Sequence, residues 1–195
     1  MLGGTFDPVH LGHLVVASEI HDALGFDEIV LVPTGRPWQK ADRDVTDGPT
    51  RLELTRLAVA ADERFTVSAV DVDRPGPTYS IDTVRDLRAQ YGDDTEFSFL
   101  VGADALAGLP SWHEIAALLD TVHVVGFARP GHRLAVPDGL PATARDRIRL
   151  IETTAIGVSS TAVRERVRAG RTIRYLVPDA VGARIAELGL YRDAA

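Results

Sequence analysis

Segments with helical and with strand-like apolar spacing alternate along almost the whole chain of 195 residues. The strand-like segment at residues 96–101 contains the continuous apolar run FSFLV, which is typical of a sheet covered by helices on both faces. Such alternation builds parallel strands that are joined by crossover helices. It predicts an α/β fold, namely a Rossmann-like doubly wound parallel sheet with helices on both faces.

The same periodicity places the individual elements. No internal repeat, low-complexity tract or linker interrupts the pattern, so we expect residues 1–195 to form a single domain, with C-terminal helices near the ligand crevice. The expected helices span residues 11–24, 52–60, 80–91, 111–119 and 160–169, with a last one from about residue 178, and the expected strands span 28–32, 66–72, 96–101, 122–127 and 154–158.

The composition excludes several classes of protein. The chain has no cysteine, which rules out disulfides, thiolate metal sites and cysteine nucleophiles. Its net charge of −7 argues against a general nucleic-acid binder. No apolar run approaches the length of a membrane span and no secretory leader is recognisable, so we expect a cytoplasmic protein that binds neither nucleic acid nor membrane.

The most informative segment is GGTFDPVHLGH at residues 3–13, which leads directly into the first expected helix. Adjacent glycines allow a ligand to approach the backbone closely, and a helix N-terminus offers unpaired N–H groups to a phosphate. His10 and His13 lie three residues apart and therefore share one face of the first helical turn. The alternative is a glycine turn followed by two solvated histidines.

A second segment with chemical potential is VSSTAVR at residues 158–164, where a late strand meets the next helix. Ser159, Ser160 and Thr161 are common helix N-cap residues, and Arg164 is either a surface charge or a clamp for phosphate. Farther upstream, Gly102 and Asp104 follow the 96–101 strand, at an edge where open α/β sheets bind ligands. Asp104 would contact a ribose hydroxyl there, or simply cap the next turn.

These segments resemble a known family. GGTFDPVHLGH is similar to the GxFDPxHxGH signature of the nucleotidyltransferase superfamily, and VSSTAVR resembles its ISSTxxR motif, with Val158 in place of Ile. GADALAGLPSW at 102–112, together with PTYSIDT at 77–83 and YLVP at 175–178, looks like bacterial nicotinate-nucleotide adenylyltransferase. The resemblance covers nearly the whole chain and implies one nucleotidyltransferase domain.

The resemblance implies transfer of an adenylyl group from ATP to nicotinate mononucleotide, with Mg²⁺ bound mainly through the ATP phosphates. A homo-oligomer is compatible with it. The implied catalytic residues are His10, His13, Lys40 and Arg164. The implied ATP ligands are Gly3, Gly4, Thr5, Phe6, His10, His13, Gly102, Asp104, Ser159, Ser160, Thr161 and Arg164. The implied nicotinate mononucleotide ligands are Thr78, Trp112, which would stack on the pyridine ring, His113 and Arg129.

Other interpretations stay open. Trp112 is also suited to the core at the start of an amphipathic helix, and Lys40, the only lysine, to a solvated loop. The family often has a histidine before this lysine, where the present chain has Gln39. Arg129 either touches ligand or ends a strand. Another transferase of the superfamily, specific for pantetheine phosphate or nicotinamide mononucleotide, and a nucleotide sensor without turnover are the competing functions.

The start of the chain carries one further expectation. Only Met1 and Leu2 precede Gly3, whereas a central parallel strand usually has about five residues. We expect the natural start to lie several codons upstream, in a short apolar segment that completes the first strand. The alternative is a short first strand that the sheet tolerates.

Overall fold

The computed structural model describes residues 1–35, 45–128, 134–154 and 156–192. Its centre is a six-stranded sheet with the order β3-β2-β1-β4-β5-β6, in which every neighbouring pair is parallel. The strand order reverses between β1 and β4, which confirms the doubly wound α/β fold. The strands are β1 Leu2–Gly4, β2 Ile29–Pro33, β3 Phe65–Val67, β4 Ser98–Gly102, β5 His123–Ala128 and β6 Ile148–Glu152.

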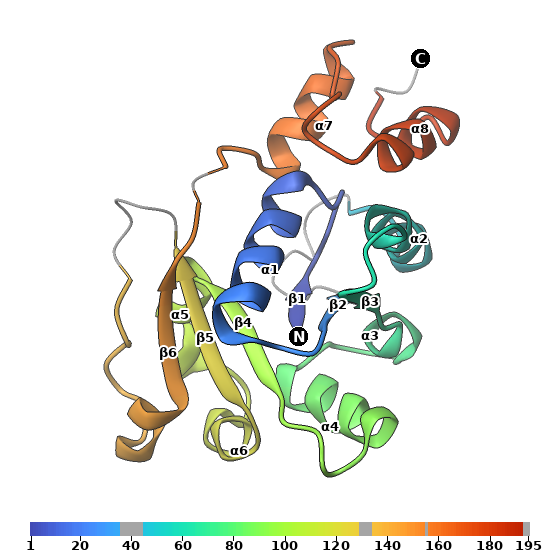
Figure 1. Ribbon diagram of the computed structural model, residues 1–195. Coiled ribbons are helices and arrows are strands. Elements are labelled where there is room, and N and C mark those ends of the chain that lie inside the picture. Colours follow the sequence, from blue (N-terminus) through green and yellow to red (C-terminus); the bar gives the residue numbers. More distant parts are fainter. Residues whose placement is uncertain (36–44, 129–133, 155, 193–195) are drawn as a thin grey trace.

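Helices cover both faces of this sheet, and each face has its own apolar core (Figure 1). Strand residues alternate between the two cores, so that Val30 faces one and Leu31 the other. The first core packs against α3 Val70–Asp73, α4 Ser80–Tyr91, α5 Ala103–Ala107 and α6 Ile115–Thr121. The second core packs against α1 Leu11–Leu24, α2 Gly48–Val59, α7 Ser160–Arg168 and α8 Asp179–Glu187.

The central strand β1 is short but paired on both sides. Leu2 is in register with Leu31 of β2 and with Leu100 of β4. The Met1 amino group donates a hydrogen bond to the carbonyl of Ser98 at 2.6 Å, and burial lowers its pKa to about 5. The described residues thus contain the short first strand, while an upstream segment stays a prediction.

Two expected strands and one expected helix differ from the structure. The 66–72 strand ends at Val67, because residues 70–73 turn into the short helix α3. The last strand is β6 at 148–152 and not 154–158; its sequence IRLIE mixes apolar and charged residues, and only Ile148 is buried, as fits an edge strand. The expected 111–119 helix is a 3₁₀ turn, Leu109–Ser111, followed by α6, and Glu114 at φ 49° separates the two.

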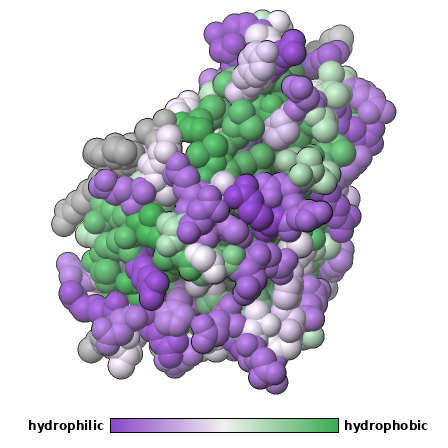
Figure 2. Space-filling model, viewed as in Figure 1, coloured by the Kyte–Doolittle hydropathy of each residue, from purple (hydrophilic) through white to green (hydrophobic). Residues whose placement is uncertain are grey.

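The edge of the sheet at β6 is visible on the molecular surface. Figure 2 shows apolar groups gathered over β5 and β6 at the left of the view, where Leu150 of the edge strand is 39% exposed. A second apolar area lies in the upper middle of the view, and polar groups cover most of the rest of the visible face. Among the described residues, no helix combines the length and the apolar character that crossing a membrane requires.

Candidate functional site

A crevice of about 530 Å³ opens at the carboxyl ends of β1 and β4, which is the point where the strand order reverses. Open α/β sheets bind ligands at such a point. The crevice brings together residues that are up to 126 positions apart in the sequence, from Met1 to Phe127. Of the predicted site residues, it is lined by Gly3, Gly4, Thr5, Phe6, Thr78, Gly102, Trp112, His113 and, from α1, His13.

The glycine-rich turn after β1 is tightly built. A Cβ on Gly4 would lie 2.8 Å from the ring of Phe6, so a larger residue at this position would force the ring to move. Phe6 itself has φ 47° and is almost completely buried, with its ring edge-to-face against His13 at a centroid distance of 5.0 Å. On the other side, a Cβ on Gly3 would meet only Phe99 at 3.5 Å, an ordinary contact. The turn therefore exposes its backbone to the crevice.

The two histidines of α1 form a stacked pair. Their ring centroids lie 3.7 Å apart with an interplanar angle of 21°. The backbone N–H of His10 donates to Nδ1 of His13 at 3.2 Å. Because Nδ1 accepts this bond, the neutral His13 ring carries its proton on Nε2. His13 is half-buried and lines the crevice.

The expected contact of His10 with phosphate stays a prediction, because this histidine lies behind its stacked partner in the structure. It is only 6% exposed and is not part of the crevice wall. The residue adopts an extended conformation as the N-cap of α1, and Gly12 leaves room for its ring, since a Cβ there would lie 3.1 Å away. Among the described residues, Nδ1 of His10 has no hydrogen-bond partner. His10 thus supports the ring of His13 by stacking against it.

The burial of His10 predicts a pH-dependent stability. Desolvation lowers the pKa of His10 to about 4, against 6.5 for the unfolded chain. Between these values the unfolded state binds the extra proton, so stability is lost as the pH falls from about 6.5 to about 4, by up to about 3 kcal/mol. We expect wild type to lose this increment relative to His10→Gln, measured by urea unfolding at several pH values. A constant difference between the two proteins would contradict the buried neutral imidazole.

The N-terminus of α7 is docked on the turn that follows β1. Ser159 caps the helix, because its Oγ accepts from the Ala162 amide at 3.1 Å. Ser160 Oγ donates to the carbonyl of Pro8 at 2.9 Å, and Arg164 Nη1 donates to the carbonyl of Asp7 at 2.7 Å. The structure therefore joins the two predicted motifs, although they are about 150 residues apart in the chain. Thr161 is exposed at the same helix end.

Aromatic side chains form part of the crevice wall. The half-buried Trp112 contacts Phe99 edge-to-face, with ring centroids 5.6 Å apart. His113 packs against Tyr79 at a centroid distance of 4.4 Å. Thr78 lies next to Tyr79 in the same wall. An aromatic wall of this kind suits a planar ring of a ligand.

Of the predicted residues that the structure describes, six do not line the crevice, namely His10, Asp104, Ser159, Ser160, Thr161 and Arg164. Asp104 is exposed in the first turn of α5 and does not line the cavity, whereas its neighbour Ala105 does. Lys40 and Arg129 lie outside the described residues.

Sequence reasoning missed two buried charges next to the crevice. Asp71 accepts from Thr83 Oγ1 at 2.7 Å and from Arg74 Nη1 at 2.9 Å, and burial raises its pKa. Arg51, 1% exposed, donates to the carbonyls of Thr5, Gly35 and Thr46 at 2.7 to 2.9 Å. The sequence offered little signal for either, since Asp71 fell inside an expected strand and Arg51 is one of twenty arginines.

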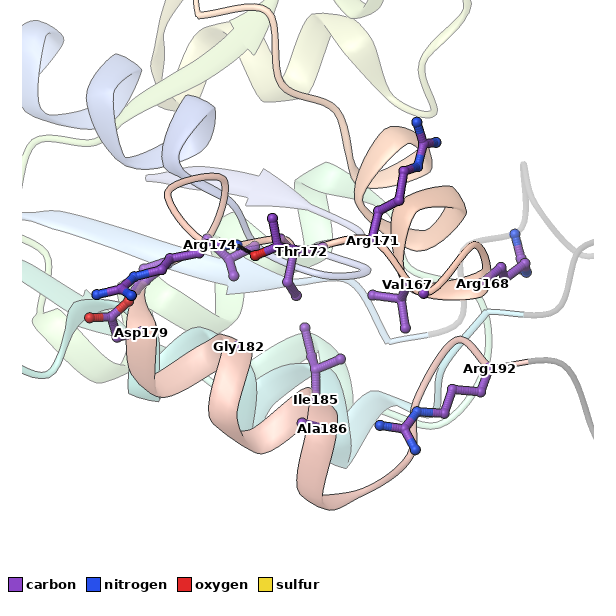
Figure 3. Close-up of a pocket in the computed structure, with 14 residues that line it drawn as sticks. Val167, Arg168, Arg171, Thr172, Arg174, Asp179, Gly182, Ile185, Ala186 and Arg192 are labelled. Carbon is purple, nitrogen blue, oxygen red and sulfur yellow. Dashed lines mark hydrogen bonds between the residues drawn. The ribbon is translucent and has the colours of Figure 1, made fainter.

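A larger cavity, of about 690 Å³, lies between α7 and α8 (Figure 3). Its inner wall is mainly apolar, with Val167 and Ile185 among the lining residues. The arginines at its rim do not converge, since Figure 3 shows Arg171 and Arg174 pointing to different sides. The crevice at the strand ends, with its exposed turn, helix N-terminus and polar side chains, is therefore the better candidate for the functional site.

Comparisons with known proteins agree with this geometry. A family model described as cytidylyltransferase-like matches residues 1–166. A nicotinate-nucleotide adenylyltransferase of Acidothermus cellulolyticus is 52% identical, covering 98% of this chain and 93% of the relative, and one of Salinispora arenicola is 49% identical, covering 98% and 100%. The structure of Plasmodium falciparum nicotinic acid mononucleotide adenylyltransferase complexed with NaAD has a TM-score of 0.74 at 17% identity, covering 97% of this chain and 95% of that one.

Proposed function

The chain belongs to the nicotinate-nucleotide adenylyltransferases of the cytidylyltransferase-like family, and we propose that the crevice at the switch point is the site of its reaction. The enzyme transfers the adenylyl group of ATP to nicotinate mononucleotide, which gives nicotinate adenine dinucleotide and pyrophosphate in NAD biosynthesis. One observation carries the assignment of the site: the glycine-rich turn, the His13 ring and the aromatic wall with Trp112 all line one cavity.

The reaction depends on the alignment of the two substrates more than on proton transfer. A phosphate oxygen of nicotinate mononucleotide attacks the α-phosphorus of ATP, a new P–O bond forms, and the bond from the α-phosphorus to the bridging oxygen breaks to release pyrophosphate. Because the attacking group is already an anion, no general base is needed. The rate then depends on positioning and on stabilisation of the charge that develops at the phosphates. We assign His13, supported by His10, and Lys40 to these phosphates.

The ATP end of the crevice follows from the docked helix. The turn residues Gly3 to Phe6 line the crevice and offer backbone atoms. The N-terminus of α7, which is docked on the carbonyl of Pro8, offers a second set of donors with Ser159, Ser160 and Thr161. Arg164 has the forked guanidinium that suits the β- and γ-phosphates. Gly102 and Asp104 are assigned to the ribose.

Mg²⁺ is proposed to arrive with ATP as part of the substrate. Among the described residues, no three His, Asp or Glu side chains lie together as a metal site. A magnesium ion that keeps several waters and binds mainly through the ATP phosphates needs few protein ligands, so it is compatible with these residues.

The whole described chain contributes to one unit. The amide of Leu11 at the start of α1 donates to the carbonyl of Leu176 at 2.9 Å, and α2 packs against α8. These contacts support the proposal of a single domain over residues 1–195.

Release of pyrophosphate from ATP tests the function, and the choice of mononucleotide tests the pocket. We assign the pyridine ring to Trp112, and its carboxylate to donors near Thr78 and His113, with Arg129 as a further ligand. An amide in place of the carboxylate would face donors with its own NH₂, so we expect kcat/KM for nicotinate mononucleotide to exceed that for the nicotinamide form by about 10- to 100-fold. Equal values would contradict this assignment.

Trp112→Ala tests the aromatic wall separately. We expect the KM for nicotinate mononucleotide to rise about tenfold or more, with the KM for ATP within about threefold of wild type, since stacking on a ring is worth about 1 to 3 kcal/mol. Trp112→Phe is the matched control, because it keeps an aromatic face. A selective loss of affinity for ATP would place the tryptophan on the other substrate.

A further inference from the structure

The tail after α8 turns back toward the glycine-rich turn. The helix ends with the amide of Leu190 donating to the carbonyl of Ile185 at 3.1 Å, and Gly189 adopts a left-handed conformation with φ 63°. Tyr191 follows with φ 62°. A non-glycine residue rarely adopts this conformation unless its surroundings hold it there. We therefore expect contacts of the Tyr191 side chain to hold this residue in place.

The Tyr191 side chain ends on a residue of the glycine-rich turn. Its hydroxyl donates to Asp7 Oδ1 at 2.8 Å, although 184 positions separate the two residues. Asp7 is only 4% exposed. Burial raises the pKa of the Tyr191 hydroxyl well above its ordinary value, so the hydroxyl stays a donor at neutral pH. Without it, a buried carboxylate oxygen would lose a hydrogen-bond partner, which is costly.

Asp7 is also the residue that Arg164 holds. Arg164 Nη1 donates to the Asp7 carbonyl at 2.7 Å and lies 3.9 Å from Asp7 Oδ2. The tail thus fixes the side chain of Asp7 and α7 fixes its backbone. Three residues farther on, His10 is the N-cap of α1, and His13 lies in the first turn of that helix, so a shift of Asp7 would be transmitted to the helix start that lines the crevice.

We propose that Tyr191 is a positioning residue for adenylyl transfer. By holding the Asp7 carboxylate, it keeps the Asp7 backbone and the Arg164 guanidinium in the arrangement that ATP meets. Tyr191 itself is not part of the crevice wall and acts through Asp7 and Arg164. The inference rests on the proposed function of the crevice, and it makes the C-terminal tail part of the catalytic unit.

Tyr191→Phe removes one oxygen and keeps the ring. We expect kcat/KM for ATP to fall about tenfold, as the loss of one hydrogen bond to a charged group predicts, while the KM for nicotinate mononucleotide stays within about twofold. The matched control is Tyr91→Phe, which removes a hydroxyl 3.4 Å from Thr66 Oγ1 and outside the crevice. This control is expected to keep wild-type kinetics.

Two further measurements separate positioning from general stability. Amide hydrogen exchange over residues 4–10, measured without substrates, is expected to be faster in Tyr191→Phe and unchanged in Tyr91→Phe. In the background of Asp7→Asn, Tyr191→Phe is expected to add less than about twofold, because coupled residues are not additive.

Unchanged kcat/KM for ATP in Tyr191→Phe, unchanged exchange over residues 4–10, or full additivity with Asp7→Asn would each overturn the proposal. The proposed function fails by a different result, namely a wild-type enzyme that releases no pyrophosphate from ATP and nicotinate mononucleotide. The exchange measurement does not depend on turnover, so the two failures remain distinguishable.

Discussion

His13→Ala is expected to lower kcat by about 100- to 1,000-fold while the protein stays folded, the size of effect seen when a donor to a developing oxyanion is removed. The ring lies at the crevice wall, and its Nδ1 accepts from the His10 amide, so the neutral ring carries its proton on Nε2. The change is measured as the initial rate of pyrophosphate release, and folding by circular dichroism.

A second histidine on the same helix provides the control. His21 lies in the last turn of α1 and pairs with Asp22, away from the crevice. His21→Ala is expected to keep kcat within about twofold, since it removes a side chain from α1 without touching the site. Near wild-type turnover in His13→Ala, or its loss together with the fold, would show that His13 has no role at the phosphates.

The parts of the fold and site that the sequence predicted are those fixed by local pattern. The continuous apolar run of β4 and the helical spacing of residues 11–24 each depend on side chains close in the chain, and both elements lie where they were expected. The glycine-rich turn was identified because a close backbone approach needs glycine at consecutive positions. The edge strand β6 was misplaced because it is apolar at only some positions, so its pattern is weak.

The contacts that the sequence did not predict are tertiary. His10 and His13 have the same spacing on the helix as any phosphate-facing pair, and only the packing around Gly12 places His10 behind its partner. The bond from Tyr191 to Asp7 joins the two ends of the chain. The order in which distant segments meet is set by the sheet topology, which no local periodicity encodes.

Arg164→Lys is expected to lower kcat/KM for ATP by about 100-fold, although the positive charge is kept. The guanidinium has five N–H donors in a planar fork, so it holds the Asp7 carbonyl with Nη1 and still has donors for phosphate oxygens. An ammonium group on a flexible stem does not reproduce this geometry. The KM for nicotinate mononucleotide should stay within about threefold, because Arg164 is not among the residues that line the crevice together with Trp112.

The control for Arg164→Lys is Arg171→Lys, which makes the same change at an exposed position in the loop after α7. It is expected to leave both KM values and the melting temperature unchanged, because surface substitutions of this kind shift stability by less than about 0.5 kcal/mol. Adding guanidinium ion to Arg164→Ala at low concentration should restore part of the rate if the planar fork acts on phosphate. A variant at Arg164 that melts at a much lower temperature, yet keeps wild-type kcat/KM for ATP while folded, would contradict a role in binding phosphate. Arg164 would then only hold α7 against the turn after β1.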